Sequence, residues 1–162
     1  MPGTHINTSI LNSVLQDAKA EKRSCCIMFL DIAKAYDNVG LQHLTECLSA
    51  LPIPSQLRNL LCSLQDGNVT SIETGRGKTA TIPFKRGVLQ GSPISPILYN
   101  ISVDHILDEL SERSVAVEFG YQIQELDPVS VLGFADDTVL VGKDAQAVLT
   151  LLDMITARFD EI

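Results

Sequence analysis

The sequence predicts an α+β fold, in which helices and strands mix without strict alternation. Apolar residues recur at helical spacing near both ends of the chain, and short apolar runs of strand length lie between them. The chain has 162 residues, 45% of them hydrophobic, so it can bury a core without a disulfide or a structural metal. We therefore expect a single domain over residues 1–162.

In the first half of the chain, apolar spacing predicts a helix over residues 6–18. A continuous apolar run over residues 25–30 then predicts a buried strand that stops at Asp31. Two helices separated by a proline-containing break follow, and after them a hairpin whose strands are joined by the sequence GRGK. The two helices span residues 39–50 and 55–64, and the hairpin strands span residues 69–74 and 79–84, with Gly75 and Gly77 in the turn.

In the second half, a helix is expected to begin with Ser95 as its N-cap and Pro96 in its first turn, and to end near Arg113. Short β-rich runs then predict two strands and a hairpin with the sequence ADD at its turn. A final amphipathic helix is expected over residues 145–159. The four strands span residues 115–119, 122–126, 129–134 and 138–141.

The charge balance excludes a protein that is coated by nucleic acid over most of its surface. Lys and Arg number 12 against 20 Asp and Glu, which gives a formal net charge of −8. One local basic patch stands out within the eleven positions from 76 to 86, where no acidic residue occurs. Its members are Arg76, Lys78, Lys85 and Arg86.

The apolar runs are too short for a membrane helix, which needs about 20 residues. The first residues, MPGTHINTS, have neither the basic nor the apolar segment of a secretory signal. We therefore expect an intracellular protein with no membrane segment. The four cysteines show no C-x-x-C spacing and are expected to be reduced and packed in the core.

Carboxylates at strand ends are the feature that points to chemistry. Asp31 ends one apolar strand, and Asp136 and Asp137 lie at the tip of an apolar hairpin. If the strands are neighbours, the carboxylates repel one another unless a cation neutralises them, and hard oxygen ligands favour Mg²⁺. Two such ions suit phosphoryl transfer. The alternative is structural, because Asp residues also close hairpins and cap helices.

Three motifs in order resemble the palm of a reverse transcriptase: FLDIAKAYD at 29–37, RGVLQGSPISPILYN at 86–100 and FADD at 134–137. The residues of these motifs are most similar to those of non-LTR, LINE-type retrotransposon enzymes. The segment from GTHINTSILNSVLQDA to FLDIAKAYDNVG resembles the ribosomal-DNA-targeted elements of arthropods. The resemblance implies a polymerase palm, a ferredoxin-like antiparallel sheet with helices packed on one face. Residues 1–24 would lead into the palm and residues 25–162 would form it, as a fragment without most of the fingers and all of the thumb.

The same resemblance assigns the catalytic centre. Asp31 and Asp136 would be metal ligands, the Ile32 carbonyl an additional ligand, and Asp137 a supporting carboxylate beside the primer end. The cofactor would be a pair of Mg²⁺ ions, with Mn²⁺ as a possible substitute.

The resemblance also assigns a nucleotide pocket. Ala35 and Tyr36 would form its floor, with the Tyr36 ring excluding a 2′-hydroxyl group. Gln90 would contact the incoming nucleotide or the template, Gly91 would allow close backbone approach, and Lys34 would contact phosphate. Lys85 and Arg86 would contact nucleic acid.

The activity implied is RNA-directed DNA synthesis, in which a primer 3′-hydroxyl attacks the α-phosphorus of a deoxynucleoside triphosphate. The partners would be an RNA template, a DNA primer and the missing fingers and thumb, and the full-length element would act in the nucleus. Two alternatives stay open: a metal-dependent nuclease, and a catalytically inert remnant that binds nucleic acid or protein. Apolar faces left uncovered by fingers and thumb are expected to promote self-association.

Overall fold

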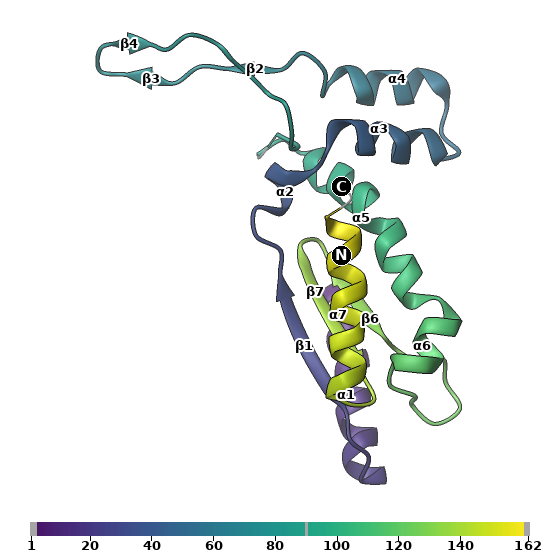
Figure 1. Ribbon diagram of the computed structural model, residues 1–162. Coiled ribbons are helices and arrows are strands. Elements are labelled where there is room, and N and C mark those ends of the chain that lie inside the picture. Colours follow the sequence, from purple (N-terminus) through teal and green to yellow (C-terminus); the bar gives the residue numbers. More distant parts are fainter. Residues whose placement is uncertain (1–2, 90, 161–162) are drawn as a thin grey trace. The chain divides into compact units, whose positions relative to one another are not determined.

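The computed structural model describes residues 3–89 and 91–160, and the chain in it forms two compact units (Figure 1). The first unit contains the residues up to Ala33 and those from Val103 onward, and the second unit is Lys34–Ser102. Within the described residues, no helix combines the length and the apolar character needed to cross a bilayer.

The first unit contains α1 (Gly3–Glu21), β1 (Cys26–Asp31), α6 (Arg113–Phe119), β6 (Val131–Phe134), β7 (Asp137–Gly142) and α7 (Ala145–Phe159). The second contains α2 (Ala35–Asn38), α3 (Leu41–Ala50), α4 (Ser55–Ser63), β2 (Val69–Thr70), β3 (Glu73–Thr74), β4 (Gly77–Lys78) and β5 (Ile82–Pro83). Helix α5 (Ser95–Ser111) begins in the second unit and ends in the first.

An antiparallel sheet in the order β1-β7-β6 is the centre of the first unit. The apolar run that predicted β1 pairs along its full length with β7, from Cys26 opposite Gly142 to Asp31 opposite Asp137. Strand β6 pairs with the other edge of β7, so that Phe134 also lies opposite Asp137. The predicted strand and hairpin therefore form one sheet, which confirms the α+β class and the antiparallel pairing.

Helices α1 and α7 pack on opposite faces of this sheet. Val141 is fully buried in a cluster with Val14 and Ala18 of α1. At the next residue, a Cβ added to Gly142 would lie 2.7 Å from the Val148 side chain of α7, so only glycine lets α7 approach this closely. Because neighbouring residues of a strand point to opposite faces, α1 covers one face and α7 the other.

In the second unit, helices α3 and α4 pack against each other through buried leucines, Leu44 and Leu48 from α3 and Leu61 from α4. The end of α3 has carbonyl groups with no partner inside the helix. Arg58 of α4 satisfies two of these groups, because its Nε donates to Leu48 O at 3.1 Å and its Nη2 to Leu51 O at 3.3 Å.

The basic hairpin forms, but it is irregular. Strands β2 and β5 pair at its base and β3 and β4 pair at its tip, each pair with two residues per strand. The turn is formed by Gly75 and Arg76, while Gly77, which was expected in the turn, is the first residue of β4. All residues from 69 to 83 are exposed.

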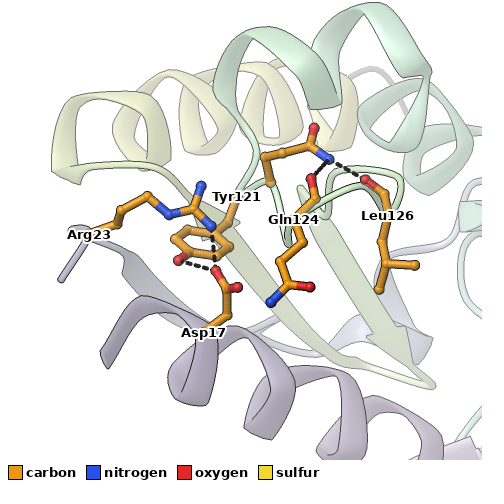
Figure 2. Close-up of polar contacts among 6 residues, drawn as sticks. Asp17, Arg23, Tyr121, Gln124 and Leu126 are labelled. Atoms are coloured by element: carbon orange, nitrogen blue, oxygen red, sulfur yellow. Dashed lines mark hydrogen bonds and ion pairs between the residues drawn. The ribbon is translucent and has the colours of Figure 1, made fainter. Parts of the chain in front are cut away.

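Two predicted strands are wrong. Residues 115–119 belong to helix α6, in which Ala116 is buried and which packs against α7. Their valines favoured a strand in isolation, but tertiary packing overrides that preference. Residues 122–126 form a loop, held by the Gln122 side chain, whose Nε2 donates to Gln124 O at 3.1 Å and also to Leu126 O (Figure 2).

Smaller differences concern helix ends and a short helix. Helix α3 begins at Leu41 and not at Val39, and the short helix α2 before it was not predicted. Helix α5 begins with Ser95 as its first residue, so Ser95 is not the N-cap that the sequence predicted; its hydroxyl donates to Leu89 O at 2.6 Å. All four cysteines are free and half-buried, so they are less deeply packed than the expected core positions.

A buried polar contact ties α1 to the loop after α6 (Figure 2). The Tyr121 hydroxyl donates to Asp17 Oδ2 at 2.9 Å, and Arg23 pairs with the same oxygen while its guanidinium lies over the Tyr121 ring, 5.2 Å from the ring centroid. Tyr121 is only 2% exposed. Burial, together with the hydrogen bond to Asp17, raises the pKa of the Tyr121 phenol.

This contact predicts an alkaline loss of stability. The phenol of a tyrosine in an unfolded chain has a pKa of about 10. Because the folded pKa lies above that value, the contribution of Tyr121 is complete below about pH 10 and is lost as pH rises through the folded pKa. Urea unfolding at several alkaline pH values should therefore show a falling free energy of unfolding. Tyr121→Phe should flatten this fall, and Tyr36→Phe should not; equal slopes in both variants would contradict the assignment.

Candidate functional site

Two carboxylates face each other at one end of the first unit's sheet. Asp31 is the last residue of β1 and Asp137 the first of β7, and they are direct cross-strand partners. Directly opposed residues point to the same face, with Cβ atoms about 5 Å apart. Both side chains are exposed, while Asp136 is half-buried in the turn between β6 and β7. The structure thus brings together the three carboxylates that the sequence singled out.

The turn that carries Asp136 has an unusual backbone. Strand β6 ends at Phe134 and β7 begins at its partner Asp137, so only Ala135 and Asp136 form the turn. Ala135 adopts a φ of 54°. This region costs a non-glycine residue about 1–2 kcal/mol, a cost that the flanking strand pairs must offset. Strained residues of this kind cluster at functional sites.

The donor set suits a hard cation. Carboxylate oxygens are ligands that Mg²⁺ prefers, and the backbone of Ile32, directly after β1, can add a carbonyl oxygen. The three carboxylates do not form a closed cluster within the described residues, because their ligand atoms do not all lie within 4.8 Å of one another. Mg²⁺ usually keeps several waters and binds substrate phosphate, so the protein need not supply all of its ligands.

A groove of about 270 Å³ opens beside these carboxylates, between α1 and the same face of the sheet. Asp137 contributes to its lining together with two aromatic side chains, Phe29 and Phe134, which are 73% and 42% exposed. Apolar side chains are therefore uncovered next to the carboxylates, as expected; whether they cause self-association stays a prediction.

The second unit contains a separate hollow of about 300 Å³. The Tyr36 ring forms part of its wall and stacks on the buried Tyr99 ring, with centroids 5.0 Å apart and planes 24° apart. The stacking holds Tyr36 in place, so the hollow has one rigid aromatic wall. Its lining residues are Tyr36, Gly91, Ser92, Ser95 and Pro96.

Backbone pairing between the first and second motifs builds this hollow. Val88 N donates to Tyr36 O at 2.9 Å, and Gly87 N donates to Val39 O at 2.8 Å. Gly87 has a φ of 90°, and an added Cβ would lie 2.9 Å from Asp37 O. Only glycine fits there. Gly91 also has a positive φ, 89°, but the space around it is open.

The remaining predicted residues are placed as follows. Ala35 is 5% exposed and belongs to the core of the second unit, while Lys34 is exposed and adopts a left-handed conformation with a φ of 53°. Lys85 and Arg86 are exposed at the base of the hairpin. The backbone of Arg86 forms an isolated antiparallel β-bridge with that of Gly40. Gln90 lies outside the described residues.

Sequence analysis missed Gly87 and the lining role of Ser92, Ser95 and Pro96. The only signal was their position inside the second motif, since a glycine or serine in a loop is not distinctive by itself. The contacts that give these residues their roles join segments about fifty positions apart in the chain.

Comparison with known families and proteins supports the resemblance. The family model described as "Reverse transcriptase (RNA-dependent DNA polymerase)" matches residues 1–162. The "Retrovirus-related Pol polyprotein from type-1 retrotransposable element R2" of Nasonia vitripennis is 30% identical over 98% of this chain and 15% of its own length. The protein of the same description from Popillia japonica is 31% identical over 97% of this chain and 22% of its own length. The chain thus spans less than a quarter of these relatives.

Solved telomerase structures share the fold. Apo telomerase from Candida tropicalis aligns with a TM-score of 0.67 at 16% identity, over 93% of this chain and 28% of that chain. Telomerase from Candida albicans in complex with the TWJ fragment of telomeric RNA aligns with a TM-score of 0.65 at 15% identity, over 98% of this chain and 28% of that chain. The arrangement of helices and antiparallel sheet is therefore one that occurs in telomerase.

The two glycines of the second motif provide a test of the hollow's construction. Gly87→Ala and Gly91→Ala impose nearly the same φ penalty, but only Gly87→Ala creates a backbone clash. We expect Gly87→Ala to destabilise the second unit by about 1–3 kcal/mol more than Gly91→Ala. Hydrogen exchange at the amides of Gly87 and Val88 should accelerate only in Gly87→Ala. Equal protection in the two variants would show that the close pairing does not form.

Proposed function

The chain belongs to the reverse transcriptase (RNA-dependent DNA polymerase) family, and we propose from this membership that it carries the nucleotidyl-transfer centre of an R2-type retrotransposon enzyme. The reaction is the addition of a deoxynucleotide to a primer 3′-hydroxyl on an RNA template. The observation that carries the proposal is the pairing of Asp31 with Asp137, with Asp136 in the adjacent turn. A protein of such an element would act in the nucleus.

The carboxylates would hold the metal. Asp31 and Asp136 are the proposed Mg²⁺ ligands, the Ile32 carbonyl an additional ligand, and Asp137 a supporting group on the same face. When bound, two such ions supply an activated 3′-hydroxyl and charge stabilisation at the leaving phosphate, and Mn²⁺ can replace them. The exposed position of Asp31 and Asp137 allows a primer terminus to reach them.

The hollow in the second unit would receive the deoxynucleotide. The rigid Tyr36 ring is the proposed barrier to a 2′-hydroxyl, and the exposed Gly91 backbone allows close approach of the substrate. Lys34 is exposed and offers a positive charge to phosphate, and Ala35, the proposed floor residue, is buried next to Tyr36 in the chain. Gln90, Lys85 and Arg86 complete the proposed contacts to nucleotide and nucleic acid.

Removal of one carboxylate charge tests the metal site directly. Asp31→Asn and Asp136→Asn keep the side-chain shape but remove a ligand charge, whereas Asp153→Asn changes an exposed residue of α7. We expect both site variants to lose at least about 100-fold in Mn²⁺ affinity, measured by electron paramagnetic resonance, and in primer extension on an RNA template. The Asp153→Asn control should match the unmodified chain.

The same assay distinguishes the alternatives. Cleavage of nucleic acid that needs Asp31 but no deoxynucleotide would replace the proposal with a metal-dependent nuclease. If the unmodified chain neither binds Mn²⁺ nor extends a primer, the proposal fails, and an inert remnant is the better description.

Substitution of Tyr36 tests the proposed sugar barrier. Tyr36→Ala removes the ring, whereas Tyr36→Phe keeps the ring and its stacking on Tyr99. The kcat/KM preference for deoxynucleotides over ribonucleotides should fall at least about tenfold in Tyr36→Ala, because steric exclusion is lost. Tyr36→Phe should keep the preference. An unchanged preference in Tyr36→Ala would remove this role from Tyr36.

A further inference from the structure

Positive charge is concentrated in the hairpin segment, residues 69–86. This segment carries four of the twelve Lys and Arg residues and only one of the twenty acidic residues, Glu73. The rest of the chain is strongly acidic, since the whole chain has a net charge of −8. A nucleic-acid backbone is therefore repelled by most of the chain and attracted to this segment.

The tip of the hairpin is fully accessible. Figure 1 shows β2 to β5 extending away from α3 and α4 of the same unit, and every residue from 69 to 83 is exposed. Arg76 lies in the turn and Lys78 in β4, and within the described part of the chain neither forms an ion pair. Even Glu73, the cross-strand partner of Lys78, does not form one. Both cations are available to a ligand.

Threonine side chains hold the tip in a defined shape. Thr74 Oγ1 donates to Gly77 O at 2.7 Å and accepts from Arg76 N at 3.3 Å. Below the tip, Thr79 Oγ1 accepts from Ile72 N at 3.0 Å, and Thr79 N donates to Ile72 O at 3.0 Å. Because the turn is already ordered, less conformational entropy is lost when Arg76 and Lys78 bind a ligand.

We propose that the hairpin tip is a second nucleic-acid contact, in which Arg76 and Lys78 bind the phosphate groups of a template or primer strand. Residues 69–83 include no aromatic side chain that could stack on a base, so the contact would be to the backbone and independent of sequence. The exposed aliphatic side chains of Val69, Ile72 and Ile82 would also fit a protein partner. Unpaired cations on an acidic chain favour nucleic acid.

This inference shares with the proposed function only the premise that nucleic acid is the partner. Its test uses fluorescence anisotropy of a fluorescein-labelled 20-nucleotide single strand, as RNA and as DNA of the same sequence, without divalent metal or nucleotides. Failure of the carboxylate site would therefore leave the result unchanged. The compared proteins are the unmodified chain, the double variant Arg76→Gln with Lys78→Gln, and the control Lys19→Gln with Arg113→Gln.

The control removes the same charge from two exposed positions in the first unit. Log affinity falls as log salt concentration rises, and each phosphate contact on a single strand makes this slope steeper by about 0.7. The tip variant lacks two such contacts, so its slope should be shallower by about 1.4. Its affinity at about 50 mM salt should fall about tenfold, and the control should change little. Glu73→Gln should bind more tightly than the unmodified chain, a gain that misfolding cannot produce.

Equal losses of slope in the RNA and DNA arms support contact with phosphate in either strand, and a loss confined to one arm assigns the contact to that strand. Equal slopes for the tip variant and the control would overturn the proposal, because net charge alone would then explain binding. It would also be overturned if the tip variant bound both strands normally but changed the sedimentation coefficient of the chain. That result would make the hairpin a contact between protein copies.

Discussion

The ladder between β1 and β7 holds two carboxylates opposite each other at the end of an otherwise apolar sheet. Its register is fixed by packing on both faces, since Val141 is buried toward α1 and Leu140, one residue earlier, is buried toward the opposite face. A slip of one residue would turn every side chain of β1 to the other face and direct Asp31 from the face covered by α1 to the face covered by α7. The apolar core therefore determines where the charged groups of the proposed catalytic centre lie.

Much of this arrangement was readable from the sequence. The run at residues 25–30, the hairpin tip at Asp136 and the amphipathic helix at residues 145–159 carry strong local signals, and the structure contains all three elements. The errors fall where local preference and packing disagree. Val115 favoured a strand, but α6 is helical because Ala116 is buried and the helix packs against α7. Burial against a neighbouring helix depends on residues far away in the sequence, so no short window contains that information.

The hollow in the second unit shows the same limit more clearly. Tyr36 and Gly91 were assigned to one pocket by resemblance to a family, whereas their proximity depends on pairing between Gly87 and Val39 and between Val88 and Tyr36. Nothing in either segment alone predicts that pairing. The close approach at Gly87 becomes visible only when Asp37 is known to lie against it. Local sequence identifies the chemistry of a residue, and long-range pairing determines which residues share a site.

The distribution of charge follows from the two kinds of ligand that a polymerase must bind. A metal site needs ionised carboxylates that form no ion pair within the protein. A contact to nucleic-acid phosphate needs Lys or Arg side chains that likewise form no ion pair within the protein. If Arg76 and Lys78 were next to Asp31 and Asp136, they would form ion pairs with these carboxylates and compete with the metal for them. The two kinds of charge are carried by different units of the chain, the carboxylates by the first unit and the basic hairpin by the second. An acidic chain with one basic arm is thus an expected outcome of the proposed chemistry.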